Sequence, residues 1–211
     1  MPTRTFADLS NNNAIAVNWP AYRKSGHILV LLKATEGESF IDQTHGGRAV
    51  HARAAGIHPG HYHFAHCDSS PIQQAQFFWS IVRPVFRGWD PLVLDVEQGG
   101  QNGKSVQECA HWTTAFDVEF RKVSGGHELI LYSDASFLSE LVRAGAHVQG
   151  TRAWIAAYGS EPPAPKGWSK WGHQFTDGEA GPLPHSCAGI GQCDVSTLNP
   201  KSYLGLLAHR P

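Results

Sequence analysis

Short apolar segments alternate with helix-like segments along most of the chain, and this alternation constrains the fold more than any other feature. The apolar segments are typical of strands that end at Asp8, Lys33, Phe64, Asp95, Tyr132 and Ala156. Helical patterns follow the first five of these strands, at residues 19–24, 43–55, 71–82, 105–123 and 134–144. Such alternation predicts parallel βαβ units, and two short strands at residues 170–176 and 192–195 follow without a helix between them. The sequence therefore predicts an α/β fold: a TIM-like barrel of about eight strands with an incomplete helical ring, (β/α)5(β)3.

Length and charge limit the possible classes of protein. The 211 residues fit one domain, because α/β barrels routinely run to ~200–250 residues as a unit. We therefore expect a single domain over residues 1–211 and a monomer. The formal net charge of −1 does not suggest a nucleic-acid-binding surface. Because no apolar run approaches the ~20 residues of a membrane span, we expect no membrane partner.

The four cysteines, Cys67, Cys109, Cys187 and Cys193, lack the paired C-x-x-C spacing of a zinc site. Cys187 and Cys193 flank a short glycine-containing loop that a disulfide could close. Free thiols explain the pattern equally well, because buried cysteine is common.

Two acids follow the apolar run Pro-Leu-Val-Leu at residues 91–94. In a strand, side chains alternate between faces, so Asp95 and Glu97 point the same way. Like charges held close together raise one pKa, which suits a general acid beside an ionised carboxylate, as in glycosidic bond cleavage. A strand end whose acids face water is the alternative interpretation.

Asp8 and Asp194 follow the first and last predicted strands. In a barrel of parallel strands the active site lies at the carboxyl ends of the strands. The barrel would therefore gather Asp8, Asp95, Glu97 and Asp194 around one mouth, although they are far apart in sequence.

Several blocks, in this order and spacing, resemble glycoside hydrolase family 25, the Chalaropsis-type lysozymes that include many phage endolysins. They are Asp-Leu-Ser at 8–10, Lys-Ala-Thr-Glu-Gly at 33–37, Ala-Gly-Ile-His-Pro-Gly-His-Tyr-His-Phe at 55–64, Asp-Val-Glu at 95–97, Leu-Tyr-Ser at 131–133, Ala-Trp-Ile-Ala-Ala-Tyr at 153–158 and Gln-Cys-Asp-Val-Ser at 192–196. The chain departs from the family pattern where Asn11, Asn12 and Asn13 replace the usual Gln and Gly, and where His173 replaces a Trp before Gln174.

The resemblance implies a catalytic domain that cleaves the β-1,4 bond between N-acetylmuramic acid and N-acetylglucosamine in peptidoglycan. It implies Glu97 as the general acid with Asp95, Asp8 and Asp194 around it, and it implies neither a cofactor nor a metal. It also favours a retaining course in which the substrate's own acetamido group attacks and Asp95 stabilises the charge. Spacing alone does not separate retention from inversion.

Five further residues near strand ends are candidates for binding substrate. Aromatic rings at Tyr62, Tyr132, Trp154 and Tyr158 could stack on sugars, with core packing as the alternative. Glu36 could orient the substrate, or form a local ion pair with Lys33.

Two other classes of protein remain open. His61 and His63 share a strand face and could hold a metal in a metal-dependent barrel hydrolase. A non-catalytic glycan-binding relative is the second alternative, against which the four acids argue. No segment near the N-terminus resembles a signal peptide. We therefore expect an endolysin held in the host cytoplasm until its release to the cell wall, with secretion by a non-classical route as the alternative.

Overall fold

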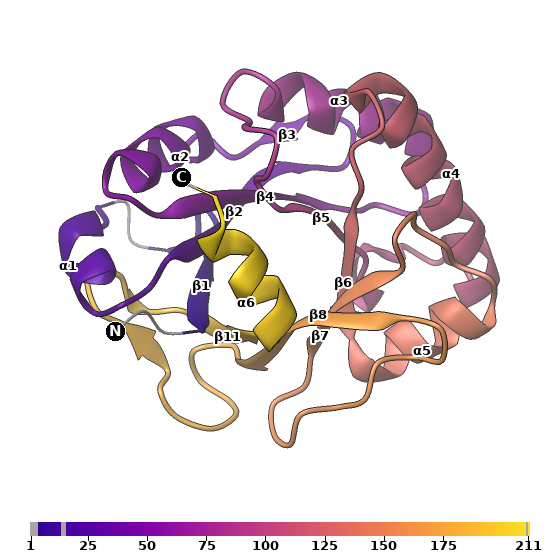
Figure 1. Cartoon of the computed structure of the whole chain (residues 1–211). Helices are drawn as coiled ribbons and strands as arrows, with labels where there is room; N and C mark the ends of the chain where they lie inside the picture. The colour runs from indigo at the N-terminus through magenta and orange to yellow at the C-terminus, as the bar shows by residue number, and fades with distance from the viewer. Residues whose placement is uncertain (1–3, 14–15, 210) are drawn as a thin grey trace.

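Eight strands close into a barrel in the computed structural model of the chain, which describes residues 4–13, 16–209 and 211 (Figure 1). They are β1 (Thr5–Leu9), β2 (Leu29–Glu36), β4 (His58–Phe64), β5 (Leu92–Asp95), β6 (Ile130–Asp134), β7 (Arg152–Ala156), β8 (Ser169–Thr176) and β11 (Asp194–Leu198). They pair in the order β1-β11-β8-β7-β6-β5-β4-β2, and the pairing of β1 with β2 closes the barrel. The short β3 (Phe40–Ile41) extends the edge of β2, while β9 (Ser186–Cys187) and β10 (Gly191–Gln192) form a separate hairpin. The predicted barrel is confirmed.

Five helices follow the first strands, as predicted, and leave the later strands uncovered (Figure 1). They are α1 (Trp19–Lys24), α2 (His45–Ala54), α3 (Pro71–Val82), α4 (Val106–Ser124) and α5 (Ala135–Arg143). Local signals define their ends: Ser105 and Glu108 form a capping box at the start of α4, and Asp134 caps α5. The longest helix, α4, is mixed in polarity, and no helix in the described ranges is both long and apolar enough to span a bilayer.

The direction of the last strand corrects one prediction. β11 runs antiparallel to both of its neighbours, β1 and β8, and Asp194 is its first residue rather than its last. The first residue of an antiparallel strand lies at the same end as the last residues of the parallel strands. Asp194 therefore still reaches the expected end of the barrel, where it lies in register with Asp8.

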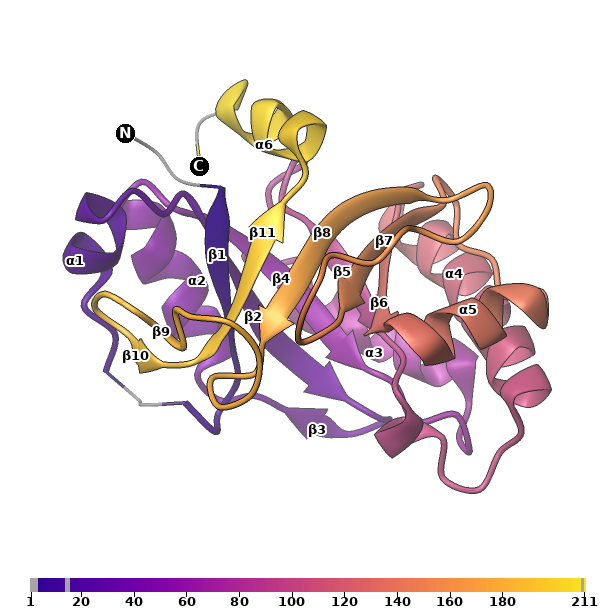
Figure 2. The same cartoon turned by 90° about the horizontal axis from the view of Figure 1, so that it is seen from below.

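Two further elements were not predicted. The turn η1 (Gln98–Gly100) follows β5, and a sixth helix, α6 (Pro200–Leu207), begins after Asn199, whose side chain accepts a hydrogen bond from the Ser202 amide. Figure 2 shows α6 at the end of the barrel toward which β11 points, opposite the β8 arrowhead.

Alternation along β5 directs its side chains into two of the three hydrophobic clusters of the described residues. Leu92 and Leu94 pack in the cluster beneath α3, α4 and α5, whereas Val93 packs inside the barrel. The interior is filled by aromatic rings, with Trp154 5.8 Å from Phe6 and 4.3 Å from Tyr132 between ring centroids. The barrel is therefore a packed core that opens only at its ends.

Candidate active site

A pocket of about 190 Å³ opens at the carboxyl ends of the parallel strands, and we call it the mouth pocket. Asp95 shares the inward face of Val93 because side chains in a strand alternate. Glu97 lies two residues farther on, where β5 has ended. The full lining comprises Asp8, Ser10, Asn12, Lys33, Tyr62, Phe64, Asp95, Glu97, Tyr132, Trp154 and Asp194. The structure thus brings together the four acids that the sequence singled out.

Asp8 and Asp194 form a carboxyl pair on adjacent strands. They share a hydrogen bond, which requires a proton on one of them. Burial, and then the charge of Asp194, raises the pKa of Asp8 well above its ordinary value. Burial raises the pKa of Asp194 to about 6. At neutral pH the arrangement favours a neutral Asp8 that donates to an ionised Asp194.

Gln174 on β8 links this pair to the other side of the pocket. Its amide nitrogen donates to Asp8 at 3.1 and 3.3 Å and to Asp194 at 3.4 Å. Its amide oxygen accepts from the hydroxyl of Tyr132 at 2.7 Å. In the sequence, Gln174 was noted only because His173, the residue before it, departs from the family pattern. Alternation along β8 puts Gln174 on the face opposite His173, and this alternation was the available signal for a residue that points into the barrel.

Asp95 and Glu97 form the second acidic pair. Burial, and then the charge of Glu97, raises the pKa of Asp95 well above its ordinary value. Burial also raises the pKa of Glu97, although a hydrogen bond with Tyr132 opposes this shift. One carboxylate oxygen of Asp95 is buried without a hydrogen-bond partner among the described residues. Burial therefore disfavours the charged form of Asp95, and its unpartnered oxygen can accept a hydrogen bond from a donor in the pocket.

Three of the four predicted aromatic residues line the mouth pocket. Tyr62 is half-buried and Tyr132 is buried, with its hydroxyl already bonded to Gln174. Trp154 is 2% exposed and donates through its indole nitrogen to Ser196 at 3.0 Å, so its main role is packing. Tyr158 lies outside the lining and is 46% exposed, with its hydroxyl 3.4 Å from Gln174.

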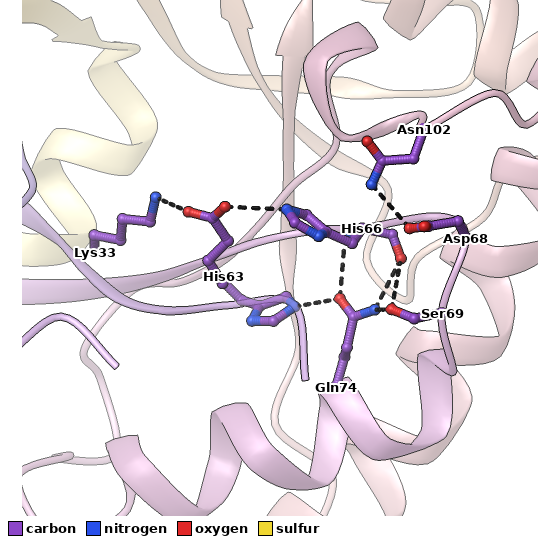
Figure 3. Close-up of polar contacts among 8 residues, drawn as sticks. Lys33, His63, His66, Asp68, Ser69, Gln74 and Asn102 are labelled. Carbon is purple, nitrogen blue, oxygen red and sulfur yellow. Dashed lines mark hydrogen bonds and ion pairs between the residues drawn. The ribbon is translucent and has the colours of Figure 1, made fainter. Parts of the chain in front are cut away.

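Glu36 lies outside the lining of the mouth pocket and binds Lys33, which does line it. Its other carboxylate oxygen contacts the His66 ring at 3.0 Å, and Figure 3 shows both contacts. Partial burial raises the pKa of Glu36, but Lys33 and His66 outweigh it and hold that pKa below its ordinary value. The ammonium of Lys33 also lies 4.9 Å from the Phe64 ring centroid. Glu36 therefore positions a lysine at the pocket and does not itself face it.

The metal-dependent alternative is not supported by where the two histidines lie. His61 and His63 do share a strand face, but it is the outer face, where they contact side chains of α2, α3 and α4, away from the mouth pocket. His61 bonds to His45 at 2.8 Å, and His63 bonds to Gln74 at 2.9 Å (Figure 3). Both rings are fully buried. Burial lowers the pKa of His63 to about 4. Both ring nitrogens of His63 are hydrogen-bonded, the second to Thr35 at 2.8 Å, whereas Nε2 of His61 has no hydrogen bond among the described residues and lies 3.5 Å from Asp90. Both are core histidines that do not reach the mouth pocket.

All four cysteines lie buried as free thiols, in two neighbouring pairs. Cys187 contacts Cys193 beside Asp194, and Cys67 contacts Cys109 between the end of β4 and α4. The structure therefore places the thiols of the proposed bridge together without joining them.

The chain matches a known family over most of its length. The family described as glycosyl hydrolases family 25 matches residues 7–182. Lysozyme M1 of Streptomyces globisporus is 28% identical over 169 residues, which cover 74% of this chain and 56% of that protein. The N,O-diacetylmuramidase of a Chalaropsis species is 28% identical over 170 residues, which cover 72% of this chain and 78% of that protein. The chain thus spans little more than half the length of lysozyme M1.

A solved structure shows the same architecture. The family GH25 lysozyme from Aspergillus fumigatus superimposes with a TM-score of 0.75 at 27% identity. The superposition covers 97% of this chain and 98% of that chain.

Proposed function

The chain belongs to glycosyl hydrolases family 25, and we propose on this premise that it is an N-acetylmuramidase, a lysozyme that hydrolyses bacterial peptidoglycan. The bond cleaved is the β-1,4 bond between N-acetylmuramic acid and N-acetylglucosamine. The observation that carries the proposal is the convergence of Asp8, Asp95, Glu97 and Asp194 on one pocket. Paired carboxyl groups with raised pKa values are the machinery of glycosidic bond cleavage.

Glu97 acts as the general acid. Burial raises its pKa, which keeps a larger fraction of the carboxyl protonated near neutral pH than an exposed glutamate would have. The proton passes to the glycosidic oxygen as the bond to the anomeric carbon breaks. Tyr132, which contacts Glu97, holds the carboxyl in place.

Asp95 assists the substrate's 2-acetamido group. As the acetamido oxygen attacks the anomeric carbon, positive charge develops on its nitrogen, and the N–H turns toward a carboxylate. The unpartnered oxygen of Asp95 supplies that acceptor. Burial disfavours an ionised Asp95. The positive charge that develops on the acetamido nitrogen offsets this cost, so the reaction is expected to proceed with Asp95 ionised and Glu97 protonated.

Digestion of purified peptidoglycan tests the bond cleaved. New reducing ends are fixed with borohydride and identified after acid hydrolysis. We expect muramitol. Glucosaminitol, or free peptide amines without new sugar ends, would contradict the muramidase assignment.

Substitution tests the acid. Glu97→Gln should lose about 10²–10⁴-fold in turnover, the usual contribution of a general acid. Glu140→Gln, on the exposed surface of α5, is the matched control and should keep full activity. A folded Glu97→Gln protein that retains more than about a tenth of wild-type activity, outside that range, would remove Glu97 from this role. A folded wild-type protein that produces no new reducing ends would instead favour a non-catalytic glycan-binding relative.

The anomer of the first product tests the course of the reaction. A retaining, substrate-assisted reaction releases the β-anomer first, which NMR detects before mutarotation. Initial release of the α-anomer would show inversion, with Asp95 as the base that activates water.

The biological setting proposed is that of an endolysin, made in the host cytoplasm and released to the wall. Expression inside bacteria should lyse cells only after the inner membrane is permeabilised. Lysis without permeabilisation would favour export by another route. Size-exclusion chromatography with light scattering tests the proposed monomer.

A further inference from the structure

A second cavity, of about 590 Å³, lies at the opposite end of the barrel, and we call it the far cavity. The first residues of β5, β6, β7 and β8 contribute to its wall, so it lies at the amino ends of these strands, whereas the mouth pocket lies at their carboxyl ends. Helix α6 forms another side, and Figure 2 shows α6 at this end. The volume lies within the ~300–1,000 Å³ range of small-molecule sites.

Aromatic rings line the rim of the far cavity. Trp89 is 43% exposed and stacks on His209, with 5.2 Å between ring centroids and 5° between planes. Phe86 and His127 meet edge to face at 4.7 Å, and Trp171 lies deeper. A half-exposed indole at the edge of a cavity provides a flat apolar face for a ring-shaped ligand at little conformational cost.

The polar groups of the far cavity favour an acceptor-rich, anionic ligand. The carboxylates in the lining are already bound by arginines: Asp90 by Arg53 at 2.7 Å, and Glu128 by Arg152 at 3.3 Å. The Nε of Arg152 is nevertheless buried without a partner among the described residues. Lys201 adds an exposed ammonium from α6. Lys201 therefore offers the far cavity a positive charge that no acid of the described lining binds.

We propose that the far cavity binds, without cleaving, a saccharide that carries a carboxylate. This deepens the proposed function, on which it rests: the occupant is a second stretch of the same wall glycan, whose stem-peptide carboxylates meet Lys201 and the part-exposed guanidinium of Arg152. Among the described residues that line the far cavity, the two carboxylates, Asp90 and Glu128, are each bound by an arginine, so the cavity holds the glycan without cleaving it. Two sites on one rigid barrel raise the effective concentration of the enzyme on an insoluble wall.

NMR titration of the full chain tests the site. The probe is a monomeric disaccharide–peptide from digested peptidoglycan, which contains no internal muramyl bond left to cleave. We expect saturable shifts of the Trp89 indole N–H and of the Lys201 and Ser202 amides. N,N′-diacetylchitobiose, which lacks the carboxylates, should bind these groups about tenfold more weakly, which corresponds to ~1.4 kcal/mol. Equal affinity for the two probes would overturn the assignment of a carboxylate ligand.

Two variants and a matched control complete the experiment. Trp89→Ala and Lys201→Glu should each weaken probe binding at the far cavity about tenfold or more, as removal of a central contact does. Leu183→Ala, at a position 81% exposed, should leave it unchanged. Should Trp89→Ala fail to fold, Lys201→Glu on the exposed face of α6 decides alone. An absence of shifts at the far cavity, or unchanged affinity in both variants, overturns the proposal.

The reducing-end assay separates this proposal from the proposed function. Wild-type protein that releases muramitol ends but gives no shifts at the far cavity overturns the second site alone. Protein that binds the probe at the far cavity but produces no new ends overturns the muramidase assignment and retains the site.

Discussion

Asp194→Asn should make the protein more stable at neutral pH while lowering its activity. An ordinary aspartate has a pKa of about 3.9, whereas burial at the mouth pocket raises that of Asp194 to about 6. The folded state therefore binds this proton more tightly than the unfolded state does. Stability is highest below pH ~3.9, falls as the unfolded chain loses its proton, and reaches its lower level above pH 6.

The size of the effect follows from these two values. A tenfold difference in proton affinity corresponds to about 1.4 kcal/mol, so ionisation of Asp194 destabilises the fold by roughly 3 kcal/mol above pH 6. Asparagine has the same shape and no charge. The change in Asp8, whose pKa the charge of Asp194 also raises, adds in the same direction.

Urea unfolding of wild type and variant at pH 4 and pH 7.5 measures the effect. Any hydrogen bond lost to the amide contributes at both pH values and cancels in the comparison. The advantage of Asp194→Asn should grow by about 2–3 kcal/mol between pH 4 and pH 7.5. Asp68→Asn is the control, because Asp68 is bonded to Asn102 and has a lowered pKa, which gives the opposite sign. An Asp194→Asn advantage that does not change with pH would refute the reasoning.

Three more predictions follow from buried groups. Burial lowers the pKa of His45 to about 3 and of His63 to about 4. The two neutral rings therefore stabilise the fold fully above pH ~6.5, and this stabilisation is lost as pH falls toward those values. His63→Gln should reduce the fall in the free energy of unfolding between pH 6.5 and pH 4, measured with urea. A fall as large as that of wild type would contradict the prediction. Alkylation of the denatured, unreduced protein followed by mass spectrometry should label Cys187 and Cys193, and a linked peptide would show a disulfide instead. Gln174→Leu should lower the free energy of unfolding by about 1–3 kcal/mol, because it removes the amide that accepts from the buried Tyr132 hydroxyl and donates to the buried Asp8 carboxyl. An equally stable variant would contradict the network.

The sequence predicted the barrel because its strands and helices carry strong periodic signals and clear caps. Residues 71–82 were predicted and observed as a helix with the same bounds, since Pro71 follows the capping residue Ser70. The direction of β11 was not predictable in this way. It depends on the path of residues 177–193, which local propensity does not encode. Helix α6 was missed although Asn199 and Pro200 form a start signal.

Alternation predicts which residues share a strand face but not which face is inside. Residues on both faces of β4 are buried, so the sequence correctly put His61 and His63 on one face but did not show whether that face points into the barrel or toward the helices. For β5 the direction was easier to predict, because two charged side chains at the end of a strand need an opening to water and cannot lie beneath packed helices. The roles of the acids and the single-domain assignment stay predictions.

The mouth pocket is polar but carries little positive charge. Of the residues that line it, Lys33 is the one with a permanent positive charge, and part of that charge is neutralised by Glu36. The neutral amide of Gln174 donates to Asp8 and Asp194 instead, and its oxygen accepts from the Tyr132 hydroxyl. An arginine in place of Gln174 would stabilise the ionised carboxylates and lower their pKa values. A general acid must keep its proton near neutral pH. Burial of the acids therefore has two effects: it destabilises the fold when Asp194 ionises above pH 6, and it helps Glu97 to keep the proton that it donates.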